Sequence, residues 1–145
     1  MKSLHWPCQP DLGLLFLRLA GAFMLLAVHG LPKALNVQQE LQVIDDPLGI
    51  GAWPTLLGAL FAQIVCPLLI AVGLLTRLAC LPILFLLLVA MLLVHPEWSL
   101  LEGQFGWLLL SIFSALALAG PGRYSLDGLL QRTRYSPSLA GGLQR

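Results

Sequence analysis

Four long apolar stretches, separated by short polar segments, organise the chain. They lie at about residues 12–30, 53–76, 78–94 and 104–119. A helix needs roughly 20 apolar residues to cross the hydrocarbon core of a bilayer, and these stretches come close to that length. Backbone polar groups inside a bilayer must bond within the same segment, so such stretches form helices. The pattern therefore predicts an all-α polytopic membrane protein, an antiparallel bundle of four transmembrane helices.

The polar segments predict how these spans are connected. Residues 31–52 form the longest connection, an outer loop whose scattered leucines and isoleucine favour a short helix on the membrane surface. Pro32 is expected to end or kink the first span, because proline removes a backbone donor. Residues 76–77 predict a tight turn between the second and third spans, and residues 120–145 form a polar cytoplasmic tail. The whole chain, 1–145, is predicted to be one membrane domain.

Composition agrees with a membrane protein. Of the 145 residues, 58% are hydrophobic and only 10% are charged, and a soluble domain would need a more charged surface. The net charge of +1 and the lack of a basic tract argue against a nucleic-acid partner. Cys8, Cys66 and Cys80 lack the paired spacing of a disulfide framework or a metal site. The lipid bilayer is therefore the expected environment.

Basic residues outside the apolar stretches predict the orientation of the chain. On one side of the membrane only Lys33 is basic. On the other side the basic residues are Lys2, Arg77, Arg123, Arg132, Arg134 and Arg145. Cytoplasmic loops carry the excess of lysine and arginine, so both termini are predicted to be cytoplasmic.

Arg18 lies inside the first apolar stretch, where a charge costs at least a few kcal/mol unless it is paired or reaches the head groups. Three ways of accommodating it remain open. Its long side chain can extend to the head groups at the cytoplasmic surface. It can form a structural clasp with Asp127 or Asp11 at that surface. It can also face a polar cavity that includes Gln63.

Gln63 is a polar residue inside the second apolar stretch. Pro67 follows four residues later and cannot donate a hydrogen bond to the Gln63 carbonyl. A polar side chain and an unpaired carbonyl in a membrane need a neighbouring helix, a water or a ligand. Counting along antiparallel helices places Gln63 opposite Gly21 or Ala22, one turn from Arg18. The interior is therefore expected to be polar near mid-membrane.

Three further polar residues are candidates for this interior. His29 and Glu102 lie near the outer ends of their spans, and with His95 they could converge on a proton or metal site. The alternative is that they are interfacial polar residues. Ser111 lies on a stripe of small and hydroxyl residues that is typical of a packing face. No spacing on a single helix supports a metal site, so no catalytic residue and no metal ligand is assigned.

Four short motifs resemble the DoxX family of small four-helix bacterial membrane proteins. The motifs are Leu17–Gly21 with His29–Lys33, Gly73–Ala79, Glu102 before the fourth stretch, and Gly120–Asp127, within about Leu14–Leu130. The family typically carries a glutamate in the second span, where this chain has Gln63, so a role that needs an ionised carboxylate there is not expected. The resemblance implies a DoxX-like domain in the bacterial plasma (inner) membrane that is linked to redox or stress responses.

The function expected from these observations is an accessory membrane subunit of a redox or stress-response system that handles quinones, oxidants or metals. It would have no catalytic activity of its own and no intrinsic cofactor, and its partner would be another protein or a second copy of the chain. A small hydrophobic ligand such as a quinone would bind in its polar interior, at Arg18, His29, Gln63, Glu102 and Ser111. Two alternatives are a quinone-reducing oxidoreductase subunit whose partner carries the cofactor, and a small transporter or metal-handling protein.

Overall fold

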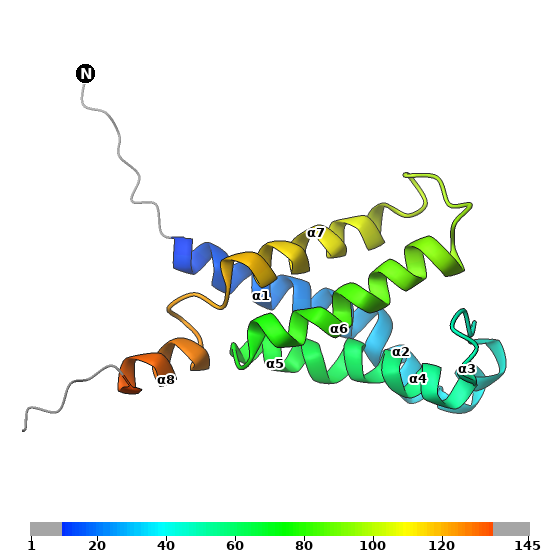
Figure 1. Cartoon of the computed structure of the whole chain (residues 1–145), viewed down its shortest axis with the longest axis horizontal. Coiled ribbons are helices and arrows are strands. Elements are labelled where there is room, and N and C mark those ends of the chain that lie inside the picture. The colour runs from blue at the N-terminus through cyan, green and yellow to red at the C-terminus, as the bar shows by residue number, and fades with distance from the viewer. Residues whose placement is uncertain (1–9, 135–145) are drawn as a thin grey trace, which may run out of the picture.

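The regular structure of the described residues is entirely helical. The computed structural model describes residues 10–134, with side chains described as far as Leu130. Over that range the chain forms α-helices and π-helical turns and no strand, so the predicted all-α class is confirmed (Figure 1). In order, with η marking a π-helical turn, the elements are α1 (Pro10–Leu25), η1 (Leu26–Gly30), α2 (Leu31–Leu35), α3 (Val37–Val43), α4 (Ala52–Leu60), η2 (Phe61–Val65), α5 (Cys66–Val72), α6 (Thr76–Val89), η3 (Ala90–Val94), α7 (Gln104–Ala119) and α8 (Leu126–Arg134).

Three continuous helices are long and apolar enough to cross a membrane. They are Pro10–Leu35, Ala52–Val72 and Thr76–Val94. The fourth apolar stretch forms α7, which has 16 residues. At helical rise α7 is about 24 Å long, less than the roughly 30 Å of a hydrocarbon core. Length and composition therefore confirm three of the predicted spans, and the four-span bundle stays a prediction.

Each of these three long helices contains a π-helical turn just before a proline. The first helix continues through Pro32 to Leu35, so Pro32 does not end it as expected. The residues preceding Pro32, Pro67 and Pro96 each donate their N–H to the carbonyl five residues earlier. Proline cannot donate, and its ring clashes with the carbonyl four residues earlier. The wider π turn moves that carbonyl, so the first two helices continue past Pro32 and Pro67. The third helix ends at Val94, before Pro96.

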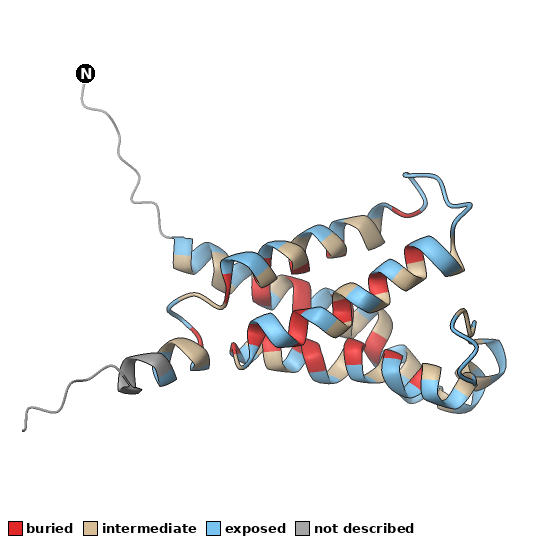
Figure 2. Ribbon diagram, viewed as in Figure 1, coloured by how far each residue is buried: buried red, intermediate tan, exposed pale blue. Residues whose placement is uncertain are grey.

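The helices form one apolar core. The helix α1 packs against α5 and α7, and α6 packs against the same two helices (Figure 1). The buried residues lie between them, with Leu25, Ile70, Ile83 and Phe113 fully enclosed (Figure 2). Large apolar side chains are exposed on the outer surface of every long helix. Apolar surface on this scale matches a lipid environment rather than water.

The long helices have two distinct ends. The termini end contains the start of α1, the turn between α5 and α6, and residues 120–134. The loop end, opposite to it, contains α2, α3 and residues 95–103 (Figure 1). Of the basic residues that predicted the orientation, Arg77 and Arg123 lie at the termini end and Lys33 lies at the loop end. Lys2 and Arg145 lie outside the described residues, and the side chains of Arg132 and Arg134 are not described.

Asp46 organises the polar segment at the loop end. Its carboxylate accepts hydrogen bonds from the N–H of Gly51 at 2.7 Å, the N–H of Ile50 at 3.1 Å and the hydroxyl of Thr55 at 3.0 Å. The Gly51 bond is the main reason why the pKa of Asp46 lies below its usual value. Gly51 has a φ of 98°, which only glycine adopts readily, so the chain can turn sharply into α4.

Candidate functional site

A pocket of about 520 Å³ opens at the loop end. Its wall comes from η1, residues 33–47, α4, η2, the end of α6, η3, residues 95–102 and α7, and is mostly apolar. The polar residues that line it are His29, Lys33, Glu40, Asp45, Thr55, Gln63, His95 and Glu102. An apolar pocket of this size with a few polar groups is typical of a small-molecule site.

Gln63 is the most deeply buried polar side chain of this pocket. It lies in the π turn η2 and is only 8% exposed. Its Oε1 atom is buried and accepts no hydrogen bond from the described residues. Leaving such an oxygen unpaired costs about 1–3 kcal/mol. A ligand that enters the pocket and donates a hydrogen bond would remove that cost.

The contact between the first two helices differs from the expected register. Gln63 lies opposite Gly30, because a Cβ on Gly30 would collide with the Gln63 carbonyl oxygen. Gly21 and Ala22, the expected neighbours, lie roughly two or more turns away along α1. Near the start of α1, Asp11 and Arg18 are bonded to Arg123 and Tyr124 instead, and Arg18 lies against Gly73 after α5. The prediction of Gly21 or Ala22 assumed that the first two helices begin and end at the same level. Because the two helices are offset along their axes, that prediction was wrong.

Arg18 and Gln63 therefore do not share a cavity. Arg18 lies against Gly73 at the termini end, and Gly30 is twelve residues farther along the same helix, about 18 Å at helical rise. Ser111 is exposed, and its hydroxyl donates to the carbonyl of Trp107 in its own helix at 2.9 Å. Of the five predicted interior residues, the pocket brings together His29, Gln63 and Glu102.

Charged and aromatic groups surround the mouth of the pocket. Lys33 and Glu40 form an ion pair at 2.8 Å, and the ring of His29 lies 5.6 Å from that of Phe105. Phe105 and this ion pair were not among the predicted site residues. The only sequence signal for the pair was two opposite charges seven residues apart, which is weak across the break between α2 and α3.

The predicted cluster of His29, His95 and Glu102 is not a metal-ligand group in this structure. All three residues line the pocket, but within residues 10–130 no three His, Cys, Asp or Glu side chains are placed to hold a metal ion. His95 stacks on Trp98 with ring centroids 3.8 Å apart. The hydroxyl and the N–H of Ser99 donate to Glu102, which lowers the pKa of its carboxyl.

A second group of polar contacts, the closing junction, lies at the termini end and consists of Asp11, Arg18, Gly73 and residues 122–128. Arg18 is only 1% exposed and donates from Nη2 to the carbonyl of Tyr124. Its Nε and Nη1 atoms have no hydrogen-bond partner among the described residues. Asp11 accepts the N–H of Arg123 at 2.8 Å.

Asp127 holds the other side of this junction. Its carboxylate accepts the N–H groups of Leu75 at 3.0 Å and Thr76 at 3.2 Å, at the start of α6. No ion pair within 4.0 Å links it to Arg18 in the described part of the chain, and the two charges interact at longer range. The predicted clasp between Arg18 and Asp127 is therefore indirect here, because each residue is bonded to backbone groups.

The sequence model of the DoxX family matches residues 13–96 of this chain. The matched part contains almost all of the three long helices, with Arg18, His29 and Gln63. Glu102 and the Gly120–Asp127 motif lie beyond it. No curated protein and no solved structure matches the chain. The match covers more than half of the 145 residues and includes three membrane-spanning helices. The chain is therefore an integral membrane protein that belongs to the DoxX family.

Proposed function

We propose that the pocket at the loop end binds a small hydrophobic ligand of the quinone class, and that the protein is an accessory subunit of a redox or stress-response system. The observation that carries this proposal is the unpaired, buried Oε1 atom of Gln63 in a mostly apolar pocket. A hydroxyl of a quinol would donate to Oε1, and a carbonyl of a quinone would accept from the amide nitrogen. His29 and Phe105 provide aromatic surface for the ring of such a ligand.

In this proposal the protein binds and positions the ligand without catalysing a reaction. Gln63 cannot ionise, so its role is to orient the head group by hydrogen bonding. The apolar wall accommodates the ring and the first part of a lipid-soluble tail. Electron transfer, where it occurs, belongs to a partner that carries a redox cofactor.

The role of Gln63 is tested by the variant Gln63→Leu, with Gln104→Leu as the matched control. Gln104 is exposed at the start of α7 and does not line the pocket. The probe is a short-chain quinone and its quinol, titrated into the detergent-purified protein and followed by quenching of tryptophan fluorescence. Gln63→Leu should weaken binding about fivefold, since a net hydrogen bond contributes about 1 kcal/mol.

Gln104→Leu should bind the probe as the wild type does. The proposal is wrong if the wild type binds neither form of the probe, or if Gln63→Leu keeps the wild-type affinity.

The proposal includes a topology in which α7 is a fourth span and both termini are cytoplasmic. The support is that α7 packs along α6 and α1, and that Arg77 and Arg123 lie at the termini end. The positive-inside rule then places that end in the cytoplasm of a bacterium, with the pocket open toward the outer face. In bacteria, a fluorescent protein fused to the C-terminus should fluoresce, whereas a periplasmic alkaline phosphatase fusion there should be inactive. The opposite pair of results would rule out this topology.

A further inference from the structure

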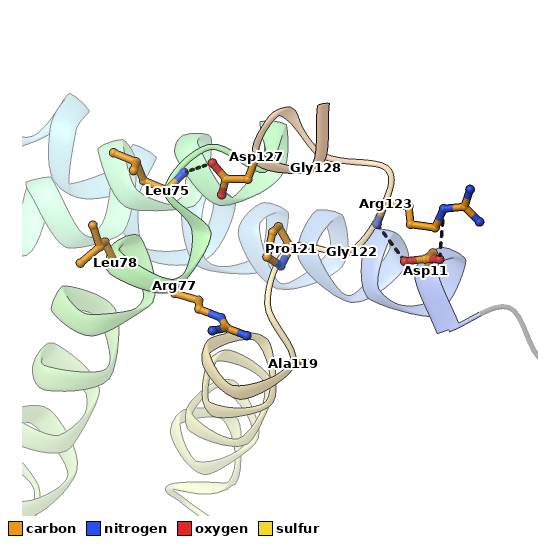
Figure 3. A pocket seen from close by; sticks show the side chains of 10 residues that line it. All are labelled: Asp11, Leu75, Arg77, Leu78, Ala119, Pro121, Gly122, Arg123, Asp127 and Gly128. Atoms are coloured by element: carbon orange, nitrogen blue, oxygen red, sulfur yellow. Dashed lines mark hydrogen bonds and ion pairs between the residues drawn. The ribbon is translucent and has the colours of Figure 1, made fainter. Parts of the chain in front are cut away.

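A groove of about 950 Å³ lies at the termini end, between the start of α6, the end of α7 and the segment that leads into α8 (Figure 3). Arg77 lines it from α6 and Arg123 from the opposite side. Figure 3 shows Arg77 reaching toward Ala119, with Arg123 beside Asp11 across the groove. We propose that this groove binds the phosphate group of an anionic phospholipid from the surrounding membrane.

The two arginines retain donors for such a phosphate. Arg77 donates from Nη2 to the carbonyl of Leu118 at 3.3 Å, near the upper limit for a hydrogen bond. The Arg123 side chain is 71% exposed, and its Nε lies 4.0 Å from Asp11. Within residues 10–130 these are the only side-chain bonds of the two arginines. A guanidinium has five N–H donors in a planar arrangement that matches phosphate oxygens, so each arginine can bind a further oxygen.

The two acidic residues of the groove are already bonded to backbone N–H groups. Asp127 accepts from Leu75 and Thr76 at the start of α6, and Asp11 accepts from the N–H of Arg123. The positive end of the α6 helix dipole compensates the charge of Asp127 further. These carboxylates therefore oppose an incoming phosphate less than free surface carboxylates would.

Apolar side chains continue from the groove into the membrane region. Leu78 lines the groove and is 60% exposed. Leu81 and Phe85 lie on the same face of α6, three and seven residues later, and are 56% and 59% exposed. Acyl chains could lie along this face while the phosphate stays at the arginines. A lipid fits this arrangement better than a free phosphate ion does, and basic pockets at the cytoplasmic ends of membrane helices commonly hold anionic head groups.

Native mass spectrometry of the full-length, delipidated protein tests this site. Phosphatidylglycerol should bind at least tenfold more tightly than a diacylglycerol with the same chains, because diacylglycerol lacks the phosphate. Arg77→Gln and Arg123→Gln should each weaken phosphatidylglycerol binding about fivefold. Lys33→Gln removes the same charge at the loop end and should have no effect on this binding.

Three results would overturn the inference. They are equal binding of the two lipids by the wild type, wild-type affinity in the double arginine variant, and displacement of phosphatidylglycerol by inorganic phosphate at equal concentration. The last result would identify a site for a free anion. The comparison of the two lipids uses only the wild type, so it holds even where a variant folds poorly.

Discussion

Replacing Gly73 with alanine is expected to lower the free energy of unfolding by about 3–5 kcal/mol. Gly73 has a φ of 75°, and a Cβ there would collide with Nη1 of Arg18 and lie 2.5 Å from Cβ of Ser125. Neither neighbour can move freely. Arg18 is bonded to the carbonyl of Tyr124, and the hydroxyl of Ser125 donates to the carbonyl of Gly122 at 2.6 Å. Backbone strain and overpacking therefore act at the same position.

This prediction is measured by unfolding the purified protein with sodium dodecyl sulfate in mixed micelles. Gly13→Ala is the matched control, because no atom lies within 4 Å of a Cβ built there. Gly13 lies on the exposed face of α1, so Gly13→Ala should leave the free energy of unfolding unchanged or raise it by up to about 1 kcal/mol. Asp127→Asn removes one hydrogen-bond acceptor from the same junction. Its free energy of unfolding should lie between those of Gly73→Ala and Gly13→Ala. Equal stability of Gly73→Ala and Gly13→Ala would contradict the tight closing junction.

Gly30→Ala is expected to destabilise the protein by about 1–3 kcal/mol and also to weaken ligand binding. A Cβ on Gly30 would collide with the carbonyl oxygen of Gln63 and lie 3.0 Å from Cγ1 of Ile64. A backbone atom cannot rotate away as a side chain can, so η1 and η2 must separate. This separation moves Gln63, which is why we expect the affinity for the quinone probe to fall as well.

The control for this variant is Gly58→Ala in α4, where no atom lies within 4 Å of the new Cβ. It should leave both stability and probe binding near the wild-type values. The stability measurement tests the close contact between Gly30 and Gln63, and the binding measurement tests whether that contact positions Gln63 for the ligand. Wild-type stability in Gly30→Ala would refute the close contact, whereas reduced stability with unchanged binding would refute the link between Gly30 and the pocket.

Hydropathy was sufficient to locate the membrane helices. A run of about 20 apolar residues favours a lipid-embedded helix whatever its neighbours are, so residues 12–30, 53–76 and 78–94 were recognised without knowledge of the fold. The ends were less accurate. The second helix ends at Val72, so the turn lies at residues 73–75, and Thr76 and Arg77, the predicted turn, are the first residues of α6. Pro32 was expected to end or kink the first helix. The helix does not end there, because the π turn η1 accommodates the proline ring.

The candidate site was only partly recognisable. His29, Gln63 and Glu102 were singled out because polar residues in or beside apolar stretches need partners, and all three line one pocket. Their role in binding remains a prediction. Arg18 attracted attention for the same reason, yet it lies at the opposite end of the helix. Nothing local distinguishes a polar residue that faces a pocket from one that bonds to a distant backbone carbonyl.

The chain's local chemistry was thus enough to establish a helical, membrane-embedded protein and to suggest its family from short motifs. The register between helices was decided only by the tertiary structure, because it depends on contacts between residues far apart in the chain. Gly30 admits the Gln63 backbone and Gly73 admits the Arg18 side chain, and these two close approaches set the offset of the first two helices. That offset separates a polar pocket at one end from a buried arginine at the other.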